Sequence, residues 1–338
     1  MNRKAPTMAD VAREAGVSPM TVSRAFKSQT HVNEETRRAV IEAADRLGYV
    51  MNNTAAGLSS QKTGFVAVTI PSINNANFAD TVRGLTEAIA EWGLQVLLGY
   101  TNYDMDEEER LVRQLLTRRP EAIVVTGGAH TGKCRRMLES AGIPVIETWD
   151  LPHQPIGSVV GFSNADAAAM MVRHLTGTGR RRLAFIGGDT TRDTRGLDRR
   201  RGFLAELQRQ GLETHRLVEA GPPPISMQEG AKALTYLMEK WPDTDAVMCV
   251  SDLAAFGALS QCQRAGIAVP GQLAICGFGA YEVARVCVPS ITTIDPHCRE
   301  IGRLAGARIL QLLGLEEAPG SEAVMRITPS LMDNESAC

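Results

Sequence analysis

The segment 127–134 comes closest in this sequence to a catalytic motif, and it reads Gly-Gly-Ala-His-Thr-Gly-Lys-Cys. It follows an apolar run typical of a strand and begins a helical one, as a phosphate-binding loop does. That motif ends in Ser or Thr, whose hydroxyl ligates Mg²⁺, whereas Cys134 stands here. The nearest candidate for an acidic partner at a strand end is Asp189. The sequence therefore does not predict nucleotide hydrolysis.

Other patterns of catalytic or metal-binding residues are also missing from the sequence. It has no G-x-S-x-G, no H-E-x-x-H and no G-x-G-x-x-G between a strand and a helix, and its six His are scattered. Its seven Cys form no C-x-x-C pair, although zinc ligands usually come a few residues apart. We therefore expect no metal, no cofactor and no enzymatic activity. An α/β enzyme is kept as a distant alternative.

Charge is divided unevenly along the 338 residues, whose formal net charge is −2. Residues 1–63 carry nine Lys or Arg and six Asp or Glu, so this head is +3 and the rest is −5. A basic head on an acidic body favours a polyanionic partner for the head alone. No run of 18 apolar residues predicts a membrane span, and charges occupy the positions where a signal peptide is apolar. We expect a cytoplasmic protein with no membrane partner.

Three short helices are predicted within residues 1–50. Each begins at a residue whose side chain can cap a helix N-terminus, and two of them end at a glycine. The capping residues are Thr7, Ser18 and Asn33, and the glycines are Gly16 and Gly48. Two helices joined by a tight glycine turn are typical of the helix-turn-helix, whose second helix enters the major groove of DNA. The apolar stripe expected on the third helix is Val40, Ile41, Ala44 and Leu47.

The outer face of the second helix carries the residues expected to read DNA. Pro19, Met20, Thr21 and Arg24 lie on it. Thr21 and Ser23 can donate to phosphates, and Arg24 can reach O6 and N7 of a guanine. The alternative on these residues alone is a small helical packing module with an exposed Arg.

Residues 8–52 resemble the DNA-binding head of the LacI/GalR family of repressors. The matching pieces are D-V-A-x-x-A-G-V-S, T-V-S-R, V-x-x-x-T-R and L-G-Y. The resemblance implies that Pro19, Met20 and Arg24 occupy base-reading positions, with Met20 suited to a thymine methyl. It also implies a homodimer on a palindromic, double-stranded operator.

Residues 51–63 are polar and small apart from Leu58, and by composition they predict a plain linker. In the family this segment is a hinge helix that folds on the operator, with a leucine matching Leu58 wedged into the minor groove. Met51 and Gly57 depart from the family's usual Pro and longer polar residue, which weakens the expected hinge. The expected DNA-binding residues are Thr7, Ser18, Pro19, Met20, Thr21, Ser23, Arg24, Asn52, Ala55 and Leu58.

From residue 64 onward, short apolar runs alternate with helical periodicity. The expected strands lie at 64–71, 94–100, 121–127, 143–148, 158–162, 181–188, 216–220, 245–251 and 273–278. The expected helices lie at 78–92, 106–119, 131–142, 164–178, 198–210, 227–240 and 252–265. This alternation predicts an α/β fold of parallel sheets covered by helices, in two halves with a cleft at the strand ends.

The body is similar to the effector-binding region of the same family, which is itself like the periplasmic sugar-binding proteins. The resemblance is carried by 71–78, 141–147, 161–164, 199–203, 250–258 and 269–278, and within the family it is strongest to the gluconate repressors. It implies a headpiece at 1–50, a hinge at 51–63, and two effector-binding subdomains. The first comprises 64–162 plus 293–320, and the second 163–292 plus 321–338.

The cleft is expected to bind a small sugar acid such as gluconate. Gly279 stands where most sugar-binding relatives have an Asp, and the segment 189–203 contains five Arg. A guanidinium fork suits a planar carboxylate. Arg199 matches the family's ligand-contacting Arg, whereas Arg200 and Arg201 are expected to coat a helix surface. The alternatives are a repressor of the same fold that responds to 2-ketogluconate or a phosphorylated sugar and, more distantly, a sugar-binding or enzymatic α/β protein.

The other cleft candidates follow strand ends, and core packing is the rival interpretation for Phe78 and Trp149. The expected effector-binding residues are Ser72, Asn74, Phe78, Tyr100, Thr126, His130, Glu147, Arg195, Arg199 and Asp252. An effector that prefers one of two body conformations would shift the population between DNA-bound and released states. The resemblance implies release, and thus a repressor of sugar-acid catabolism.

Overall fold

The computed structural model describes residues 5–26, 32–51, 63–188, 191–317 and 322–338. By its internal contacts the chain divides into two compact units, Met1–Thr63 and Gly64–Cys338. We call the first unit the head and the second the body, and each is described by itself. No helix among the described residues is long and apolar enough to cross a membrane.

The head contains the three predicted helices, α1 (Met8–Glu14), α2 (Pro19–Ala25) and α3 (Glu34–Leu47). Their predicted N-caps are confirmed, because Thr7, Ser18 and Asn33 each accept a hydrogen bond from a backbone N–H of the first turn. Val11, Val22 and Val40 are fully buried where the three helices meet.

The predicted apolar stripe of α3 is partly wrong. Ile41 is 41% exposed and Leu47 is 36% exposed, whereas Ala43 is buried beside Val40 and Ala44. The buried face of α3 is therefore formed by Val40, Ala43 and Ala44.

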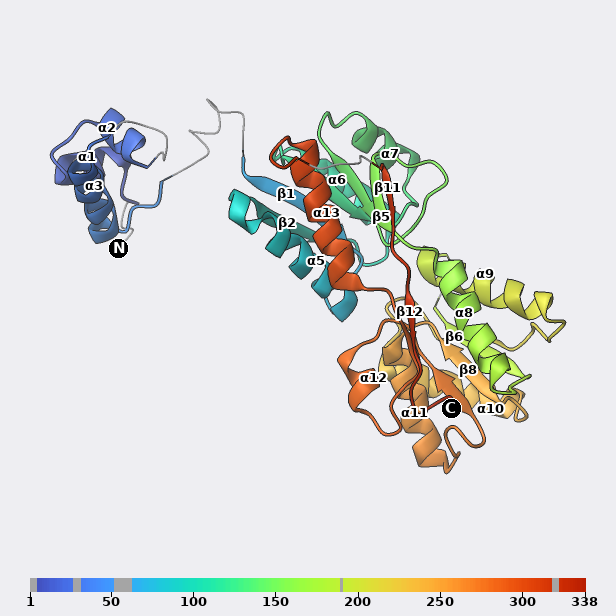
Figure 1. Ribbon diagram of the computed structural model, residues 1–338. Coiled ribbons are helices and arrows are strands. Elements are labelled where there is room, and N and C mark those ends of the chain that lie inside the picture. Colours follow the sequence, from blue (N-terminus) through green and yellow to red (C-terminus); the bar gives the residue numbers. More distant parts are fainter. Residues whose placement is uncertain (1–4, 27–31, 52–62, 189–190, 318–321) are drawn as a thin grey trace. The chain divides into compact units, whose positions relative to one another are not determined.

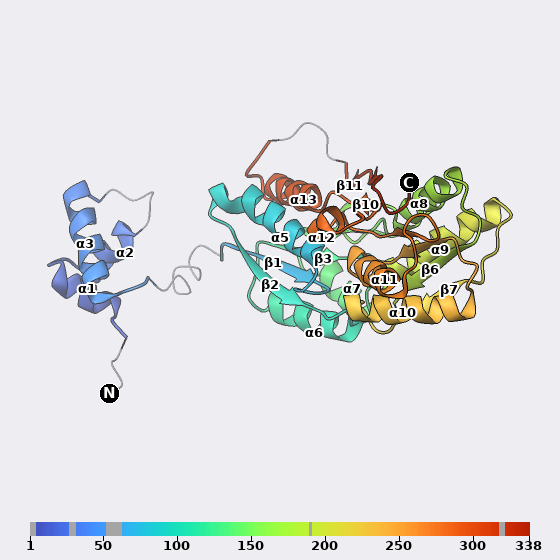
Figure 2. The ribbon, with the colours of Figure 1, turned by 90° about the horizontal axis from the view of Figure 1, so that it is seen from below.

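The first lobe of the body is built on a six-stranded parallel sheet in the order β11-β5-β4-β3-β1-β2 (Figure 1). The strands are β1 (Phe65–Ile70), β2 (Gln95–Tyr100), β3 (Ala122–Thr126), β4 (Val145–Thr148), β5 (Ser158–Gly161) and β11 (Val324–Arg326). Helices α5 (Ala76–Ile89), continued by η1 (Ala90–Trp92), and α13 (Cys298–Leu312) cover one face. Helices α6 (Met105–Leu116) and α7 (Gly132–Glu139) cover the other (Figure 2).

The second lobe has a four-stranded parallel sheet in the order β7-β6-β8-β9. Its strands are β6 (Leu183–Gly187), β7 (Leu217–Glu219), β8 (Ala246–Cys249) and β9 (Ala274–Cys276). Helices α8 (Asn164–Gly177) and α9 (Thr194–Arg209) pack together, as do α10 (Met227–Lys240) and α11 (Asp252–Ala265). The short α12 (Glu282–Val286) follows β9. The predicted α/β architecture of parallel sheets covered by helices is confirmed.

The end of the chain returns to both lobes. Strand β12 (Ser330–Met332) pairs antiparallel with β10 (Thr293–Asp295). Beyond it, the Ser336 carbonyl accepts a hydrogen bond from Ile275 N in the second lobe. The expected boundary placed all of 321–338 in the second subdomain, whereas β11 pairs with β5 in the first lobe's sheet. An edge strand of only three residues is too short to show the alternating apolar pattern by which strands are predicted.

Two glycines allow α5 and α13 to cross at close range. A Cβ on Gly84 would lie 2.1 Å from the Arg299 carbonyl oxygen, and one on Gly302 would lie 1.9 Å from that of Thr81. Neither distance is possible for real atoms, and both obstructing atoms belong to backbone. The crossing therefore depends on the absence of side chains at both positions.

Gly302→Ala is expected to lower the free energy of unfolding by roughly 1–3 kcal/mol, because the added methyl forces two packed helices apart. The matched control is Gly177→Ala in α8, where a Cβ meets nothing within 4 Å. That change is expected to raise stability by up to about 1 kcal/mol through helix propensity. Urea denaturation of both variants measures the difference, and equal effects would contradict the close-crossing argument.

Candidate functional site

The outer face of α2 is available to a ligand of the head. Pro19, Met20 and Arg24 are exposed, Met20 by 64%, while Val22 and Ala25 face the head core. Thr21 and Ser23 are half-buried on the flanks of this face.

The hydroxyls of Thr7 and Ser18 are already engaged in capping. Thr7 Oγ1 donates to Asp10 Oδ2 at 2.6 Å, and Ser18 Oγ accepts from Thr21 N at 3.1 Å. These residues fix the first turns of α1 and α2. Three further predicted contacts, Asn52, Ala55 and Leu58, lie outside the described residues.

Two arginines of α9 define the effector candidate in the body. Helix α9 begins four residues earlier than the sequence predicted, because Asp193 Oδ1 accepts a hydrogen bond from Gly196 N and caps it. Arg195 and Arg199 therefore lie one helical turn apart on the same buried face. Arg200 and Arg201 lie toward solvent and pair with Glu219 and Asp198, as expected for a helix surface.

Arg199 is a buried cation with few polar partners. It donates to Asn164 Oδ1 at 2.7 Å, and its Cζ lies 4.4 Å from the centroid of the Phe278 ring. Its Nε has no hydrogen-bond partner among the described residues. Burial lowers the pKa of Arg199, with the charge of Asp193 opposing this effect. A buried guanidinium with an unused N–H favours an anionic partner.

Arg195 lies among aromatic rings at the wall of the first lobe. Its Cζ is 5.7 Å from the Phe78 centroid and 5.8 Å from that of Tyr103, and its Nη1 reaches the Thr126 carbonyl at 3.5 Å. Burial raises the pKa of Tyr103 to about 12, which keeps its phenol protonated as a hydrogen-bond donor. Phe78 is buried against Trp149, with their centroids 5.0 Å apart. We call Phe78, Tyr103, Arg195 and Arg199 the cleft cluster.

The two lobes contact each other directly beside the cleft cluster, where the cavity lined by Tyr103 and Arg195 measures only about 30 Å³. Tyr281 of the second lobe donates to Asn75 Oδ1 of the first at 2.6 Å, and Arg192 donates to the Asn102 carbonyl at 2.7 Å. Gly279 makes this approach possible, because a Cβ there would lie 2.5 Å from both Asn77 Nδ2 and the Tyr281 ring. Its φ of +126° is also a conformation that favours glycine. Gly279 therefore permits this close contact between the lobes, which we call the closed body. It also lacks the carboxylate that an Asp at this position would have.

Asp252 does not line the cleft in this structure. Its side chain is fully buried, and its two oxygens accept hydrogen bonds from Thr293 Oγ1 at 2.6 Å and Tyr281 N at 2.8 Å. It therefore ties α11 to β10 and to the segment before α12. Burial raises the pKa of Asp252 to about 6, although both hydrogen bonds oppose this.

The raised pKa makes the stability of the body depend on pH. The folded state holds the Asp252 proton more tightly than the unfolded state, so the stabilisation is complete below pH 3.8 and is lost as pH rises through about 6. The difference is worth about 3 kcal/mol. In Asp252→Asn, the free energy of unfolding is expected to decrease less between pH 3.8 and about 6 than it does in the wild-type protein. Asp252→Ala is expected to destabilise at every pH, because it leaves the Tyr281 N–H unpaired; urea titrations test both.

His130 and Glu147 also lie away from the cleft cluster. The His130 side chain is only 1% exposed, and its Nδ1 lies 2.8 Å from Glu108 Oε2. Its Nε2 lies 3.7 Å from Glu147 Oε1, while Glu147 Oε2 accepts from Ile156 N at 2.7 Å. His130 and Glu147, both predicted as effector contacts, therefore lie close to each other inside the first lobe. Glu108 of α6 is the third member of this group.

The remaining predicted residues are divided. Thr126 lies beside Arg195, with its own hydroxyl donating to the Thr69 carbonyl. Ser72 is buried and its Oγ accepts from Asn74 N, so Ser72 shapes the turn before α5. Asn74 is exposed, and Tyr100 is 55% exposed at the end of β2, beside a shallow recess rather than in the cleft cluster.

Four cleft residues were not among the predicted contacts: Asn75, Tyr103, Asn164 and Tyr281. Asn164 belongs to the segment 161–164 that carried part of the family resemblance, so a signal for it was present. Tyr103 follows Asn102, and both have a φ near +50°. This left-handed turn directs Tyr103 inward, and no residue preference predicts it.

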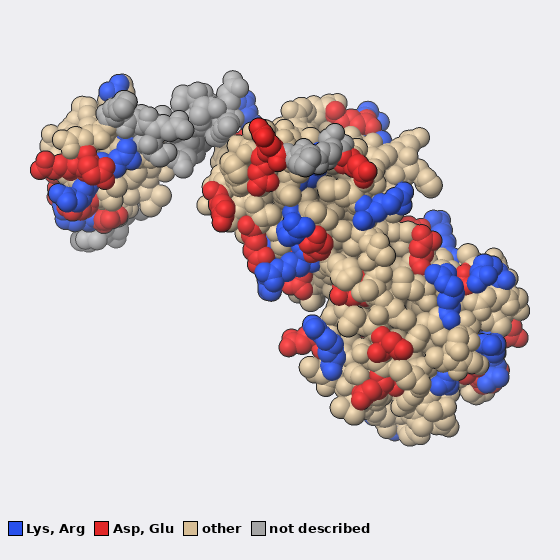
Figure 3. All heavy atoms as spheres, in the orientation of Figure 1, with Lys and Arg blue, Asp and Glu red and all other residues tan. Residues whose placement is uncertain are grey.

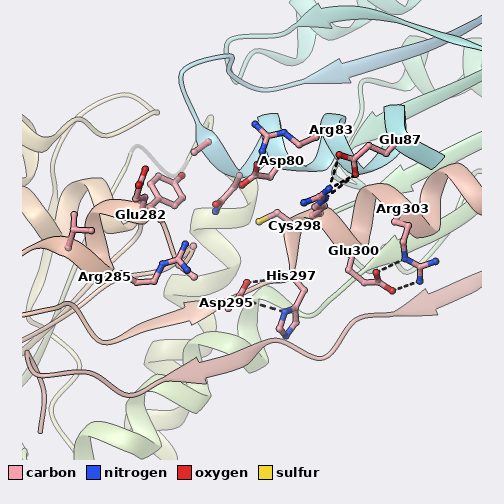
Figure 4. Close-up of a pocket in the computed structure, with 17 residues that line it drawn as sticks. Asp80, Arg83, Glu87, Glu282, Arg285, Asp295, His297, Cys298, Glu300 and Arg303 are labelled. Carbon is pink, nitrogen blue, oxygen red and sulfur yellow. Dashed lines mark hydrogen bonds and ion pairs between the residues drawn. The ribbon is translucent and has the colours of Figure 1, made fainter. Parts of the chain in front are cut away.

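A separate groove of about 1050 Å³ lies between α5, α12 and α13 (Figure 4). Several of its charged side chains are paired with one another. Arg299 contacts Glu87 at 2.8 Å, and His297 lies 3.5 Å from Asp295. Because the lining contains acidic as well as basic side chains, it presents no excess of positive charge to an anionic effector. On the face of the body drawn in Figure 3, basic and acidic side chains likewise alternate.

A helix-turn-helix head joined to a two-lobed body with a polar cleft defines a DNA-binding regulator that responds to a small ligand. Residues 7–52 match the family "Bacterial regulatory proteins, lacI family", and residues 172–336 match a "Periplasmic binding protein-like domain". The chain therefore belongs to the lacI family of bacterial regulatory proteins, and it is a transcriptional regulator rather than an enzyme.

Its relatives cover nearly the whole chain. It is 37% identical over 331 residues to the HTH-type transcriptional regulator GntR of Pseudomonas aeruginosa, covering 98% of this chain and 95% of that protein. It is 32% identical to the HTH-type transcriptional regulator IdnR of Escherichia coli, covering 90% and 91%. A LacI-family regulator from Silicibacter pomeroyi has a TM-score of 0.92 at 32% identity, covering 98% and 99%.

Proposed function

We propose that the protein represses genes of sugar-acid catabolism and is released from its operator by a gluconate-like acid. The observation that carries this proposal is the pair Arg195 and Arg199 on one face of α9. Arg199 is buried, and its Nε has no partner among the described residues, while Arg195 contacts two aromatic rings and lies 3.5 Å from the Thr126 carbonyl. A carboxylate between them would gain charge-assisted hydrogen bonds in a site of low dielectric constant.

The rest of the ligand fits the neighbouring side chains. Phe78 offers an apolar ring edge, and Tyr103 offers a phenol for a hydroxyl group of the ligand. Gly279 leaves out the acidic side chain that would repel a carboxylate. A neutral sugar would leave the two guanidinium groups uncompensated, so charge is the expected basis of selection.

The head is proposed to read a palindromic operator as part of a homodimer, in the cytoplasm. Arg24, Met20 and Pro19 of α2 would contact base edges in each half-site. The unit boundary at Thr63 separates the reading head from the ligand-binding body. An effector acts on DNA binding only if it binds the closed and open bodies unequally. We propose that it prefers the closed body held by Tyr281 and Asn75.

Calorimetric titration of the full-length protein with gluconate tests the proposed function, with glucose, 2-ketogluconate and glucose 6-phosphate as comparators. Binding of gluconate but not glucose, with release of operator DNA, is the expected result. Tight binding of only 2-ketogluconate, or of only glucose 6-phosphate, would support an anion-binding site at the arginines. It would change the proposed identity of the effector. Binding of glucose as tightly as gluconate would overturn the role proposed for the arginines.

A further inference from the structure

The buried cluster around His130 combines three kinds of metal ligand. Glu108 comes from α6, His130 from the loop after β3, and Cys134 from the first turn of α7. His130 Nδ1 lies 2.8 Å from Glu108 Oε2, and Cys134 Sγ lies 3.9 Å from the same oxygen. The three ligand atoms all lie within 4.8 Å of one another. Small side-chain movements would bring all three within coordination distance of a single ion.

We propose that Glu108, His130 and Cys134 form a binding site for Zn²⁺ inside the first lobe. One imidazole, one thiolate and one carboxylate are the donor types that Zn²⁺ accepts, and three protein ligands leave a fourth position for water. The thiolate selects against Mg²⁺ and Ca²⁺, which take oxygen ligands. The proposal does not depend on the identity of the effector.

Glu147 is placed to orient the imidazole. Its Oε1 lies 3.7 Å from His130 Nε2, and neither atom has a hydrogen-bond partner among the described residues. With Nδ1 bound to the metal, Nε2 carries the proton and points at this carboxylate. A carboxylate behind the second ring nitrogen is the usual support of a zinc-binding histidine. The other oxygen of Glu147 is fixed by Ile156 N, so the support is rigid.

The fold explains why sequence spacing predicted no metal. Only His130 and Cys134 are close in sequence, and the third ligand lies 22 residues earlier. Thr131 links the two helices, because its Oγ1 accepts from Cys134 N at 3.0 Å and donates to Glu109 Oε2 at 2.7 Å. This contact holds the start of α7 against the acidic first turns of α6. Glu108 is thereby placed opposite both other ligands.

Titration of metal-stripped, full-length protein with ZnCl₂ tests the proposal. Calorimetry is expected to give one Zn²⁺ per chain. Replacement by Co²⁺ is expected to give thiolate-to-metal charge-transfer absorption. Absence of stoichiometric binding, or Co²⁺ binding without this band, would overturn the proposal.

Variants separate this site from adventitious binding by the other thiols. Cys134→Ala is expected to remove the charge-transfer band and to weaken zinc binding at least about 10-fold. The control Cys262→Ala removes an equally buried cysteine of α11 and is expected to change neither. Glu147→Gln is expected to weaken binding about 10- to 100-fold while keeping the band, as a positioning residue should. Zinc binding by Cys134→Ala equal to that of the Cys262→Ala control would refute the site.

Discussion

Arg24→Ala is expected to lower specific operator affinity about 10- to 100-fold, the usual value of a bidentate contact between an arginine and a guanine. Non-specific affinity should fall much less, because only one positive charge near the backbone is removed. The operator is first selected by the wild-type protein from a random DNA pool. Binding is then measured for the selected site and for a scrambled duplex at one fixed salt concentration.

The matched control for this prediction is Arg13→Ala, which removes the same charge from α1. Arg13 is exposed and lies 3.1 Å from Asp10, away from the outer face of α2. Its loss should weaken both duplexes equally and slightly. If Arg24→Ala and Arg13→Ala have the same effect on the ratio of specific to non-specific binding, then α2 is not the reading helix.

Arg199→Ala is expected to lower affinity for the sugar acid by at least about 30-fold, because it removes the buried partner of a buried carboxylate. Operator affinity without effector should be unchanged, since the head and the body are separate units. The variant should therefore behave as a repressor that no longer responds. Calorimetry gives the first quantity, and operator release at rising effector concentration gives the second.

Arg201→Ala serves as the control for Arg199→Ala. It lies on the same helix, but its side chain is 67% exposed and pairs with Asp198 at 3.0 Å. Its loss should leave effector affinity within a factor of two or so, as for most surface ion pairs. A thermal melt of each variant checks that the body is folded. If Arg199→Ala binds the effector as tightly as the wild-type protein does, α9 does not contribute to the effector site.

Most helices and strands of this fold could be predicted because the apolar periodicity of each segment matches the element that the segment forms. Helix α10 and helix α11 have the limits that helical periodicity predicted, 227–240 and 252–265. Helix α9 was predicted too short, because the cap at Asp193 lies within a run of charged residues that hides the helical period. The missing first turn is the one that carries Arg195.

The site was harder to predict than the fold. A position after a strand places a residue at the correct sheet edge, but it does not determine the direction of the side chain. His130 and Asp252 follow strands and Glu147 lies within β4, yet each side chain turns into a buried hydrogen-bonded cluster. Arg199 and Phe78 were proposed through the resemblance to the family, whereas the position of Tyr103 depends on a left-handed turn.

The chain passes between the lobes three times, after β5, near β10, and between β11 and β12. A chimera that exchanges one lobe for that of a relative therefore needs three junctions, each matched in register. Exchange of the head needs one, close to residue 63. DNA specificity can thus be recombined by a single crossover, whereas new effector specificity must come from substitutions within an inherited body.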